Sequence, residues 1–171
     1  MIISGYVAIL FGRSRSTEDI DLFVGKMDYG EFSAFYNKII SSSKYYCINA
    51  ESSQDAYELL MEKSSIRFAE HGTVTPNFGV KFPQNELNLY SLENALTVDL
   101  GNRRRIKIGP LELQLAYKLS LGSDKDLDDA DHLYRVFKNA IDKAELKRFV
   151  KKLHIKDTTA EKVFGKDYEK K

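Results

Sequence analysis

Two aspartates stand one residue apart at the start of an apolar run, in the segment "DIDLFV" at positions 19–24. In a β-strand, residues i and i+2 point to the same side, so Asp19 and Asp21 direct their carboxylates together. Two like charges side by side are unfavourable unless a cation lies between them. Mg²⁺ prefers oxygen ligands of this kind, so the spacing predicts a site for Mg²⁺ (or Mn²⁺) at Asp19 and Asp21.

A second set of ionisable residues lies about a hundred positions further along the chain. At about 100° per residue, Lys118 falls on the edge of the apolar face of a predicted helix, where its ammonium needs an anionic partner. In the next predicted helix, Asp126 and Asp129 lie on or beside the apolar face, whereas Asp128 and Asp131 lie opposite. The spacing therefore predicts two inward carboxylates on one helix, and a lysine at the edge of the apolar face of the other.

The elements that must position these residues follow from hydrophobic period, caps and turn residues. Predicted strands cover 1–3, 19–24, 45–50, 65–70, 78–82, 96–100 and 105–109. Predicted helices cover 6–11, 29–43, 54–63, 110–121, 125–138, 142–153 and 157–168. Because composition changes near Gly109-Pro110, we expect an α/β core in 1–109 and a helical region packed on it in 110–171. The predicted fold class is α/β (α+β).

The bulk composition narrows the class of protein. The chain has 171 residues, 43% hydrophobic and 30% charged, with a net charge of +1, which is typical of a globular domain and gives no general argument for binding nucleic acid. Cys47 is the only cysteine, which excludes an intramolecular disulfide and favours a reducing compartment. No apolar stretch is long enough to span a bilayer, so we expect a cytoplasmic protein with no membrane partner.

The motifs in combination resemble the DNA polymerase β-like nucleotidyltransferase superfamily: a Ser4-Gly5 turn, a short helix, a polar loop and Asp-x-Asp before an apolar strand. The segment "GRSRSTEDIDLF", with Glu112, Lys118 and "KDLDD" at 125–129, is similar to small prokaryotic proteins related to abortive-infection and toxin–antitoxin nucleotidyltransferases. The resemblance covers most of the chain. It implies a nucleotidyltransferase-like mixed sheet with flanking helices and a C-terminal helical bundle.

The resemblance also implies a reaction, the Mg²⁺-dependent transfer of a nucleotidyl group from a nucleoside triphosphate to an unknown acceptor, RNA or protein. It implies a toxin-like role, and a cognate antitoxin or a second copy of the chain as partner. The turn would present backbone N–H groups to the triphosphate, and the arginine forks would match phosphate oxygens. The catalytic residues it implies are Asp19, Asp21, Lys118, Asp126 and Asp129, and the nucleotide-binding residues are Ser4, Gly5, Arg13, Ser14 and Arg15.

Each of these roles has a structural alternative. The Asp-x-Asp pair fits an exposed strand start, and the loop arginines fit solvated side chains. Ser123 and Asp126 form a capping pattern for the predicted helix that follows them. Lys118 then serves as an internal link to one of the aspartates.

Two departures from the family pattern favour a different class of function. The strand "NFGVKF" carries no third carboxylate, and Lys81 stands where one is expected; Asp99, Asp126 and Asp129 are the candidate substitutes. Only three residues precede Ser4, where relatives have a helix and a fuller strand, so either the chain starts upstream or its edge is trimmed.

The alternative function is a catalytically degenerate fold that binds nucleotide, RNA or a partner protein. A metal-dependent phosphohydrolase fits less well, because no His-Asp pair accompanies the aspartates.

Overall fold

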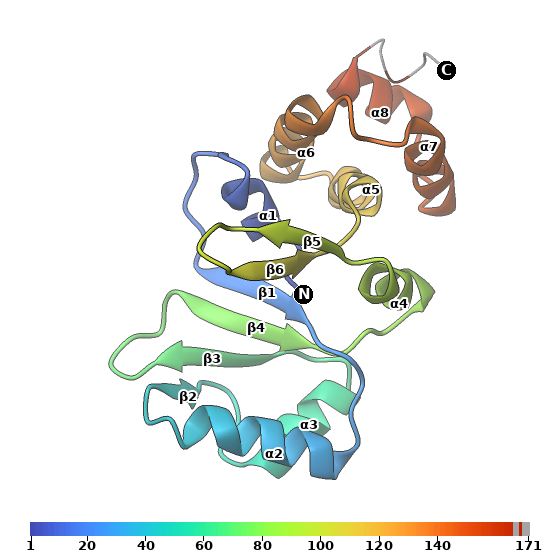
Figure 1. Cartoon of the computed structure of the whole chain (residues 1–171). Coiled ribbons are helices and arrows are strands. Elements are labelled where there is room, and N and C mark those ends of the chain that lie inside the picture. The colour runs from blue at the N-terminus through green and yellow to red at the C-terminus, as the bar shows by residue number, and fades with distance from the viewer. Residues whose placement is uncertain (166–167, 169–171) are drawn as a thin grey trace.

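The computed structural model describes residues 1–165 and 168, which form eight helices, a four-stranded sheet and a two-stranded hairpin (Figure 1). The helices are α1 (Gly5–Leu10), α2 (Tyr29–Ile40), α3 (Ser53–Met61), α4 (Glu86–Glu93), α5 (Leu111–Leu121), α6 (Asp124–Phe137), α7 (Lys143–Lys152) and α8 (Asp157–Phe164). The strands are β1 (Asp19–Phe23), β2 (Tyr45–Cys47), β3 (Ile66–Glu70), β4 (Asn77–Lys81), β5 (Leu96–Asp99) and β6 (Arg105–Ile108). The predicted mixed fold with a helical C-terminal region is confirmed.

The four-stranded sheet fixes the direction of the two aspartates. Its order is β1-β4-β3-β2, with β1 parallel to β4 and the other pairs antiparallel. Alternation along the strands separates Asp19 and Asp21 from the buried cluster that α2 and α3 build on the other face. That cluster contains Phe32, Tyr36, Leu60, Ile66, Phe68 and Val80. Asp19 and Asp21 therefore point to the side where the C-terminal helices lie.

Capping side chains set the starts of several helices. Asp28 and Glu31 form a capping box at α2, and Ser52 and Asp55 form another at α3. At α6, the Ser123 side chain accepts a hydrogen bond from the backbone N–H of Asp126 at 3.2 Å. These local bonds satisfy donors that the helix itself leaves unpaired.

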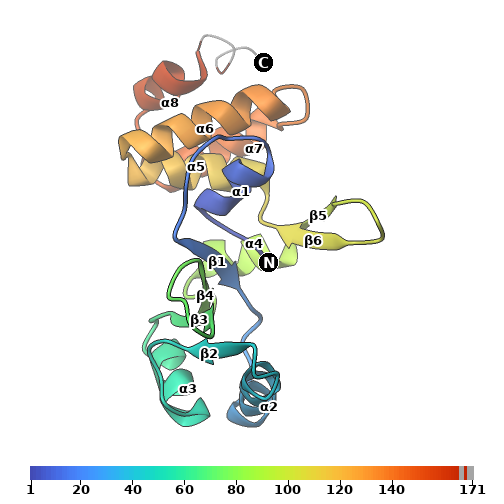
Figure 2. The same ribbon diagram turned by 90° about the vertical axis from the view of Figure 1, so that its left-hand side faces the viewer.

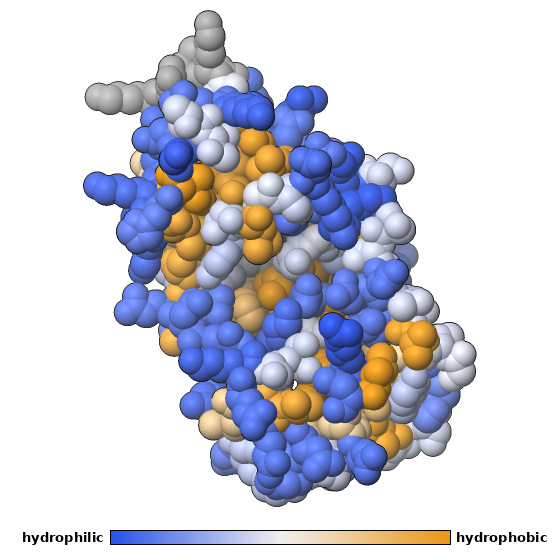
Figure 3. Space-filling model, turned by 180° about the vertical axis from the view of Figure 1, so that it is seen from behind, coloured by the Kyte–Doolittle hydropathy of each residue, from blue (hydrophilic) through white to orange (hydrophobic). Residues whose placement is uncertain are grey.

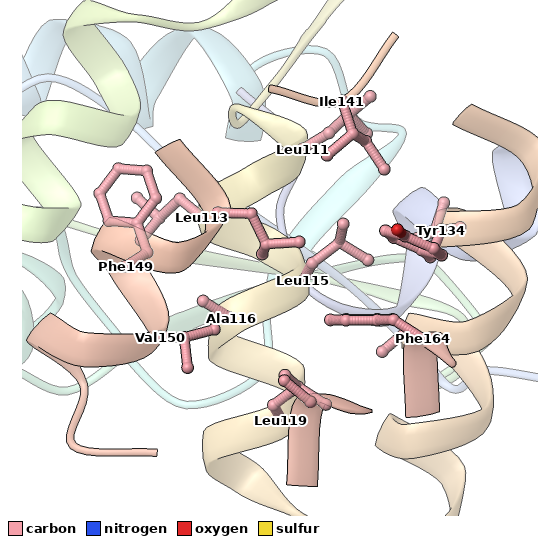
Figure 4. Packing of buried hydrophobic residues seen from close by; sticks show 14 of the residues in the cluster. Leu111, Leu113, Leu115, Ala116, Leu119, Tyr134, Ile141, Phe149, Val150 and Phe164 are labelled. Carbon is pink, nitrogen blue, oxygen red and sulfur yellow. The ribbon is translucent and has the colours of Figure 1, made fainter. Parts of the chain in front are cut away.

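A second and larger core joins α1 to the C-terminal helices. Val7 and Ala8 of α1 are fully buried among side chains of α5, α6, α7 and α8, and α1 lies directly beside α6 (Figure 2). Figure 4 shows α5 in the middle of this core, with Leu115 directed toward the stacked rings of Tyr134 and Phe164. Residues on both sides of the predicted seam at Gly109-Pro110 thus share one core.

The first three residues tie this core to the sheet. The backbone N–H of Ile2 donates to the carbonyl of Lys107 in β6 at 2.7 Å, and the N–H of Phe23 in β1 donates to the carbonyl of Met1 at 2.9 Å. Ile2 thereby bridges β1 and β6, as the predicted short strand at 1–3 requires.

Two helices differ from the sequence-based expectation. Helix α4 was not predicted, because its apolar residues do not gather on one face and Leu89 is 48% exposed. Its start is set by Asn85, whose side chain accepts a hydrogen bond from the N–H of Asn88 at 2.9 Å. Helix α8 ends at Phe164, before the predicted end at 168, and residues 166 and 167 of that prediction lie outside the described residues.

The surface is mixed in character. Seen from behind (Figure 3), hydrophobic side chains show in the helical half and in the half that holds the four-stranded sheet, with mainly hydrophilic side chains around them. Among the residues that the structure describes, no helix combines the length and the apolar character that a bilayer crossing needs.

Candidate functional site

A cavity of about 220 Å³ lies where the start of β1, the turn before α1 and the start of α6 meet. It is lined by Ser4, Gly5, Arg15, Thr17, Asp19, Asp21, Ser123, Lys125 and Asp126. Residues more than a hundred positions apart therefore form one polar hollow between the sheet and the helical half. The cavity combines carboxylates, which can hold a cation, with the cationic side chains of Arg15 and Lys125, which can hold an anion.

The two aspartates of β1 occupy different environments within the cavity. The Thr17 hydroxyl donates to the carbonyl oxygen of Asp19 at 3.0 Å and lies 3.4 Å from its Oδ1. Asp21 instead accepts from the ammonium of Lys81 at 2.9 Å, through its Oδ1. Lys81 projects from β4, the strand that pairs with β1. Part of the repulsion between the aspartates is therefore relieved by a lysine of the chain itself.

The donor set can be tested for its fit to Mg²⁺. In residues 1–165 and 168 there is no group of three or more His, Cys, Asp or Glu side chains placed to hold a metal ion. Asp19 and Asp21 offer two carboxylates, with one oxygen of Asp21 already bound to Lys81. Mg²⁺ is commonly held by one or two carboxylates together with substrate phosphates. The set therefore fits an ion that arrives with phosphate ligands, and it does not form a complete cage.

Behind the cavity, Asp129 is fully buried and surrounded by cations. Its carboxylate accepts two hydrogen bonds from Arg15, at 3.0 and 2.9 Å, and one from Lys118 at 2.8 Å. The Nε of Arg13 lies 3.6 Å from the same carboxylate, and Arg13 also bonds the exposed Asp128 at 2.8 Å. Lys118 is thus an internal link to Asp129, as the structural alternative proposed, and Arg15 is held in place from behind.

Asp126 combines a capping role with a place in the cavity. One of its carboxylate oxygens accepts from the Ser123 hydroxyl at 2.6 Å, while the other lies 3.7 Å from the Lys118 ammonium. The start of α6 therefore presents Ser123, Lys125 and Asp126 to the cavity as one ordered unit.

The turn before α1 is shaped by close contact with Arg15. Ser4 adopts φ 64° and ψ −144°, a region that residues other than glycine rarely occupy, at a cost of about 1–3 kcal/mol. A Cβ on Gly5 would lie 1.9 Å from Nη2 of Arg15, so only glycine leaves room for the guanidinium. The glycine of the Ser-Gly pair is thus explained by packing at the cavity wall.

A second cavity, of about 200 Å³, adjoins the first and shares Ser4 and Asp21 with it. Its other lining residues are Ile3, Phe23, Lys81, Asn88, Ser91, Leu113, Gln114, Tyr117, Lys118 and Leu121. Helices α4 and α5 supply most of these side chains, and Lys118 reaches this cavity with only 4% of its side chain exposed.

Some of the predicted site residues lie away from the two cavities. Ser14 is exposed on the loop and lines neither of them, and Arg13 points to the outer side of Asp129. Glu112, which the resemblance matched to a family position, accepts from the backbone N–H of Asp142 before α7 at 2.9 Å. Asp99 is an exposed hairpin residue that pairs with Arg105 at 3.7 Å.

Other lining residues were not among the predicted site residues. Thr17 and Lys125 lie within the quoted motifs, close in sequence to the predicted aspartates. That position was the sequence feature that could have identified them as lining residues. Asn88 and Ser91 belong to the unpredicted helix α4, and the Asn85 cap was the only local sign of it. Gln114 and Tyr117 lie on a predicted helix, but a glutamine and a tyrosine on a buried helix carry no distinctive spacing.

Comparison with known proteins identifies a shared fold. No protein-family model matches the sequence, and no curated protein matches it. The structure is similar to the crystal structure of an antigenic nucleotidyltransferase-like protein from Paracoccidioides brasiliensis, with a TM-score of 0.54 and 18% sequence identity. The match covers 95% of this chain and 82% of that one.

Proposed function

We propose that the chain, which shares a nucleotidyltransferase-like fold with the Paracoccidioides brasiliensis protein, binds a nucleoside triphosphate with Mg²⁺ (or Mn²⁺) in the cavity between β1 and α6. It transfers the nucleotidyl group to an acceptor. The observation that carries this proposal is the convergence of the Ser4-Gly5 turn, both aspartates of β1 and the start of α6 on that one cavity.

Each charged group of the cavity has a role in this proposal. Asp19 and Asp21 would hold the metal ion, which would neutralise phosphate charge during the transfer. Arg15 and Lys125 bind the outer phosphates, with Arg15 pre-oriented by its two bonds to Asp129. Asp126 lines this cavity, and Lys118 lines the adjoining one with its ammonium 3.7 Å from Asp126, so the pair positions the nucleotide where the two cavities meet.

The acceptor and the biological setting rest on the family resemblance. We propose RNA or a protein as the acceptor, a toxin-like role in the cytoplasm, and a cognate antitoxin or a second copy of the chain as partner.

One observation favours a second candidate function, a degenerate fold that binds nucleotide, RNA or a partner protein without transfer. Lys81 stands where the family pattern places a third carboxylate, and it occupies one oxygen of Asp21. A lysine at this position opposes the binding of a second metal ion and removes a candidate general base.

A labelling experiment separates the two functions. The chain is incubated with Mg²⁺, each of the four α-labelled nucleoside triphosphates, and either total RNA or a protein extract. Transfer of label to either acceptor, lost in the double variant Asp19→Asn/Asp21→Asn and kept in Asp99→Asn, supports the enzyme. Saturable nucleotide binding with no transferred label supports the binding module, and neither binding nor transfer contradicts both.

A further inference from the structure

The cavity between α4 and α5 holds polar groups without partners in the protein. Gln114 is 7% exposed, and its Nε2 donates to the carbonyl of Gly109 at 3.3 Å, while its Oε1 has no hydrogen-bond partner among the described residues. Ser91 is 5% exposed, and its hydroxyl also lacks a partner there. Both side chains line the cavity, and neither atom is among the fully enclosed unpaired atoms of the described residues, so each is open to a hydrogen bond from a polar ligand in the cavity.

Tyr117 adds a third group with free hydrogen-bonding capacity. Its hydroxyl oxygen accepts from Nδ2 of Asn88 at 3.3 Å, while Oδ1 of Asn88 accepts from the backbone N–H of Gln84 at 3.1 Å. The side chains of Asn88 and Asn85 therefore both orient the Tyr117 hydroxyl at the cavity wall. Burial raises the pKa of Tyr117, so the phenol stays protonated at neutral pH.

The rest of the wall is apolar and suits a flat ring. Phe23, Leu113 and Leu121 line the cavity together with the ring of Tyr117. Pockets for drug-sized ligands measure about 300–1,000 Å³, so a volume of about 200 Å³ fits a single heterocycle better than a whole nucleotide. An apolar wall with a few convergent polar groups is the arrangement that orients such a ring.

The position of the cavity indicates which ligand would place a flat ring there. It shares Ser4 and Asp21 with the neighbouring polar cavity, where the proposed function places the phosphates and the metal ion. A nucleotide with phosphates in the polar cavity can therefore extend its sugar past Asp21 and insert its base between α4 and α5.

We propose that the cavity between α4 and α5 is the nucleobase subsite, and that Ser91 and Gln114 determine base recognition by hydrogen-bonding the edge of the base. This inference rests on the proposed function, because it assigns the second half of the same ligand. It also gives a role to α4, a helix outside the motifs on which the family resemblance depends.

The test compares the affinity of the protein for a nucleoside triphosphate with its affinity for tripolyphosphate, which has the phosphates but no base. Calorimetry measures the affinities of the four Mg²⁺–nucleoside triphosphates and of Mg²⁺–tripolyphosphate for the wild type, Ser91→Ala and Gln114→Met. Gln54→Met on α3 and Ser120→Ala on α5 are matched controls, because both residues are exposed and line neither cavity. We expect the wild type to bind its preferred nucleotide at least about tenfold more tightly than tripolyphosphate. Each cavity variant should lose about five- to tenfold in nucleotide affinity and keep its tripolyphosphate affinity, since one hydrogen bond is removed.

Three outcomes would overturn the inference. Equal affinity of the wild type for nucleotide and tripolyphosphate would show that the base makes no contribution, while leaving the phosphate cavity intact. An unchanged nucleotide affinity in both variants would place the base elsewhere. An equal loss for both ligands would show that Ser91 and Gln114 support the fold or the phosphate cavity. If the wild type binds neither ligand, the proposed function fails, and the inference fails with it.

Discussion

At the scale of single residues, Asp129 organises the charge around the candidate site. It is fully buried, and its carboxylate holds both Arg15 and Lys118. An isolated buried charge is costly, so the three groups stabilise one another only as a set. Since Arg15 also lines the cavity between β1 and α6, the set couples protein stability to the orientation of a cationic side chain at the candidate site.

This arrangement predicts that substitutions of Asp129 and of Lys118 lower the stability of the protein by different amounts. Asp129→Asn leaves Arg15 and Lys118 without their shared counter-charge, and we expect it to lower the free energy of unfolding by about 3–5 kcal/mol. Lys118→Met removes one bond but leaves Asp129 with both bonds from Arg15, so a loss of about 1–3 kcal/mol is expected. Urea denaturation of both variants measures the difference. A larger loss in Lys118→Met would show that Lys118, and not Asp129, is central to the cluster.

Lys81 gives a second prediction at this scale. Lys81→Glu places a third carboxylate beside Asp21, so Mn²⁺ without nucleotide should raise the melting temperature of the variant by mass action. The wild type, with only two carboxylates and one of them paired to Lys81, should respond little. Differential scanning calorimetry with and without Mn²⁺ makes the comparison, and Lys26→Glu, at an exposed position, is the control. A wild-type response equal to that of Lys81→Glu would contradict this account of Lys81.

At the scale of elements, the turn before α1 and the loop before β1 act together. Gly5 contacts the Arg15 guanidinium, and Arg15 in turn contacts α6 through Asp129. Gly5 and α6 are far apart in the sequence, so the sequence alone does not predict that Gly5 affects a contact with α6. The effect arises because α1 packs against α6.

Gly5→Ala tests this dependence. The new Cβ must displace Arg15 from its place beside the turn, which weakens its bonds to Asp129. We expect a loss of about 1–3 kcal/mol in stability together with weaker binding of tripolyphosphate. Gly25→Ala is the matched control, because nothing lies within 4 Å of a Cβ at that position. Wild-type stability in Gly5→Ala would show that Arg15 moves without cost.

Helices and strands could be predicted from the sequence where neighbouring residues alone determine their structure. The caps at Asp28 and Ser52, the alternation around Asp19 and the helical period from 110 onward all act over a few residues. Helix α4 was missed because its apolar side chains follow no single face, so its packing depends on the rest of the fold. The direction of Lys118 was predictable from helical period, whereas the contact between Arg15 and Asp129 joins residues 114 positions apart.

At the scale of the whole molecule, the candidate site lies between two cores. One core joins the sheet to α2 and α3, and the other joins α1 to the C-terminal helices. Both cavities lie where the chain passes from one core to the other, along residues 3–23. The quoted motifs contain most of the residues that line the cavity between β1 and α6, but fewer of those that line the cavity between α4 and α5, because the latter depends on α4.

Titration of the chain with a nucleoside triphosphate by calorimetry, with and without Mg²⁺, tests the central claim most directly. We expect saturable binding that requires Mg²⁺ in the wild type and in Asp99→Asn. The double variant Asp19→Asn/Asp21→Asn should bind at least about tenfold more weakly, a loss of about 1.4 kcal/mol or more. Wild-type affinity in the double variant, or binding that ignores Mg²⁺, would contradict the assignment of these two aspartates to a metal–nucleotide site.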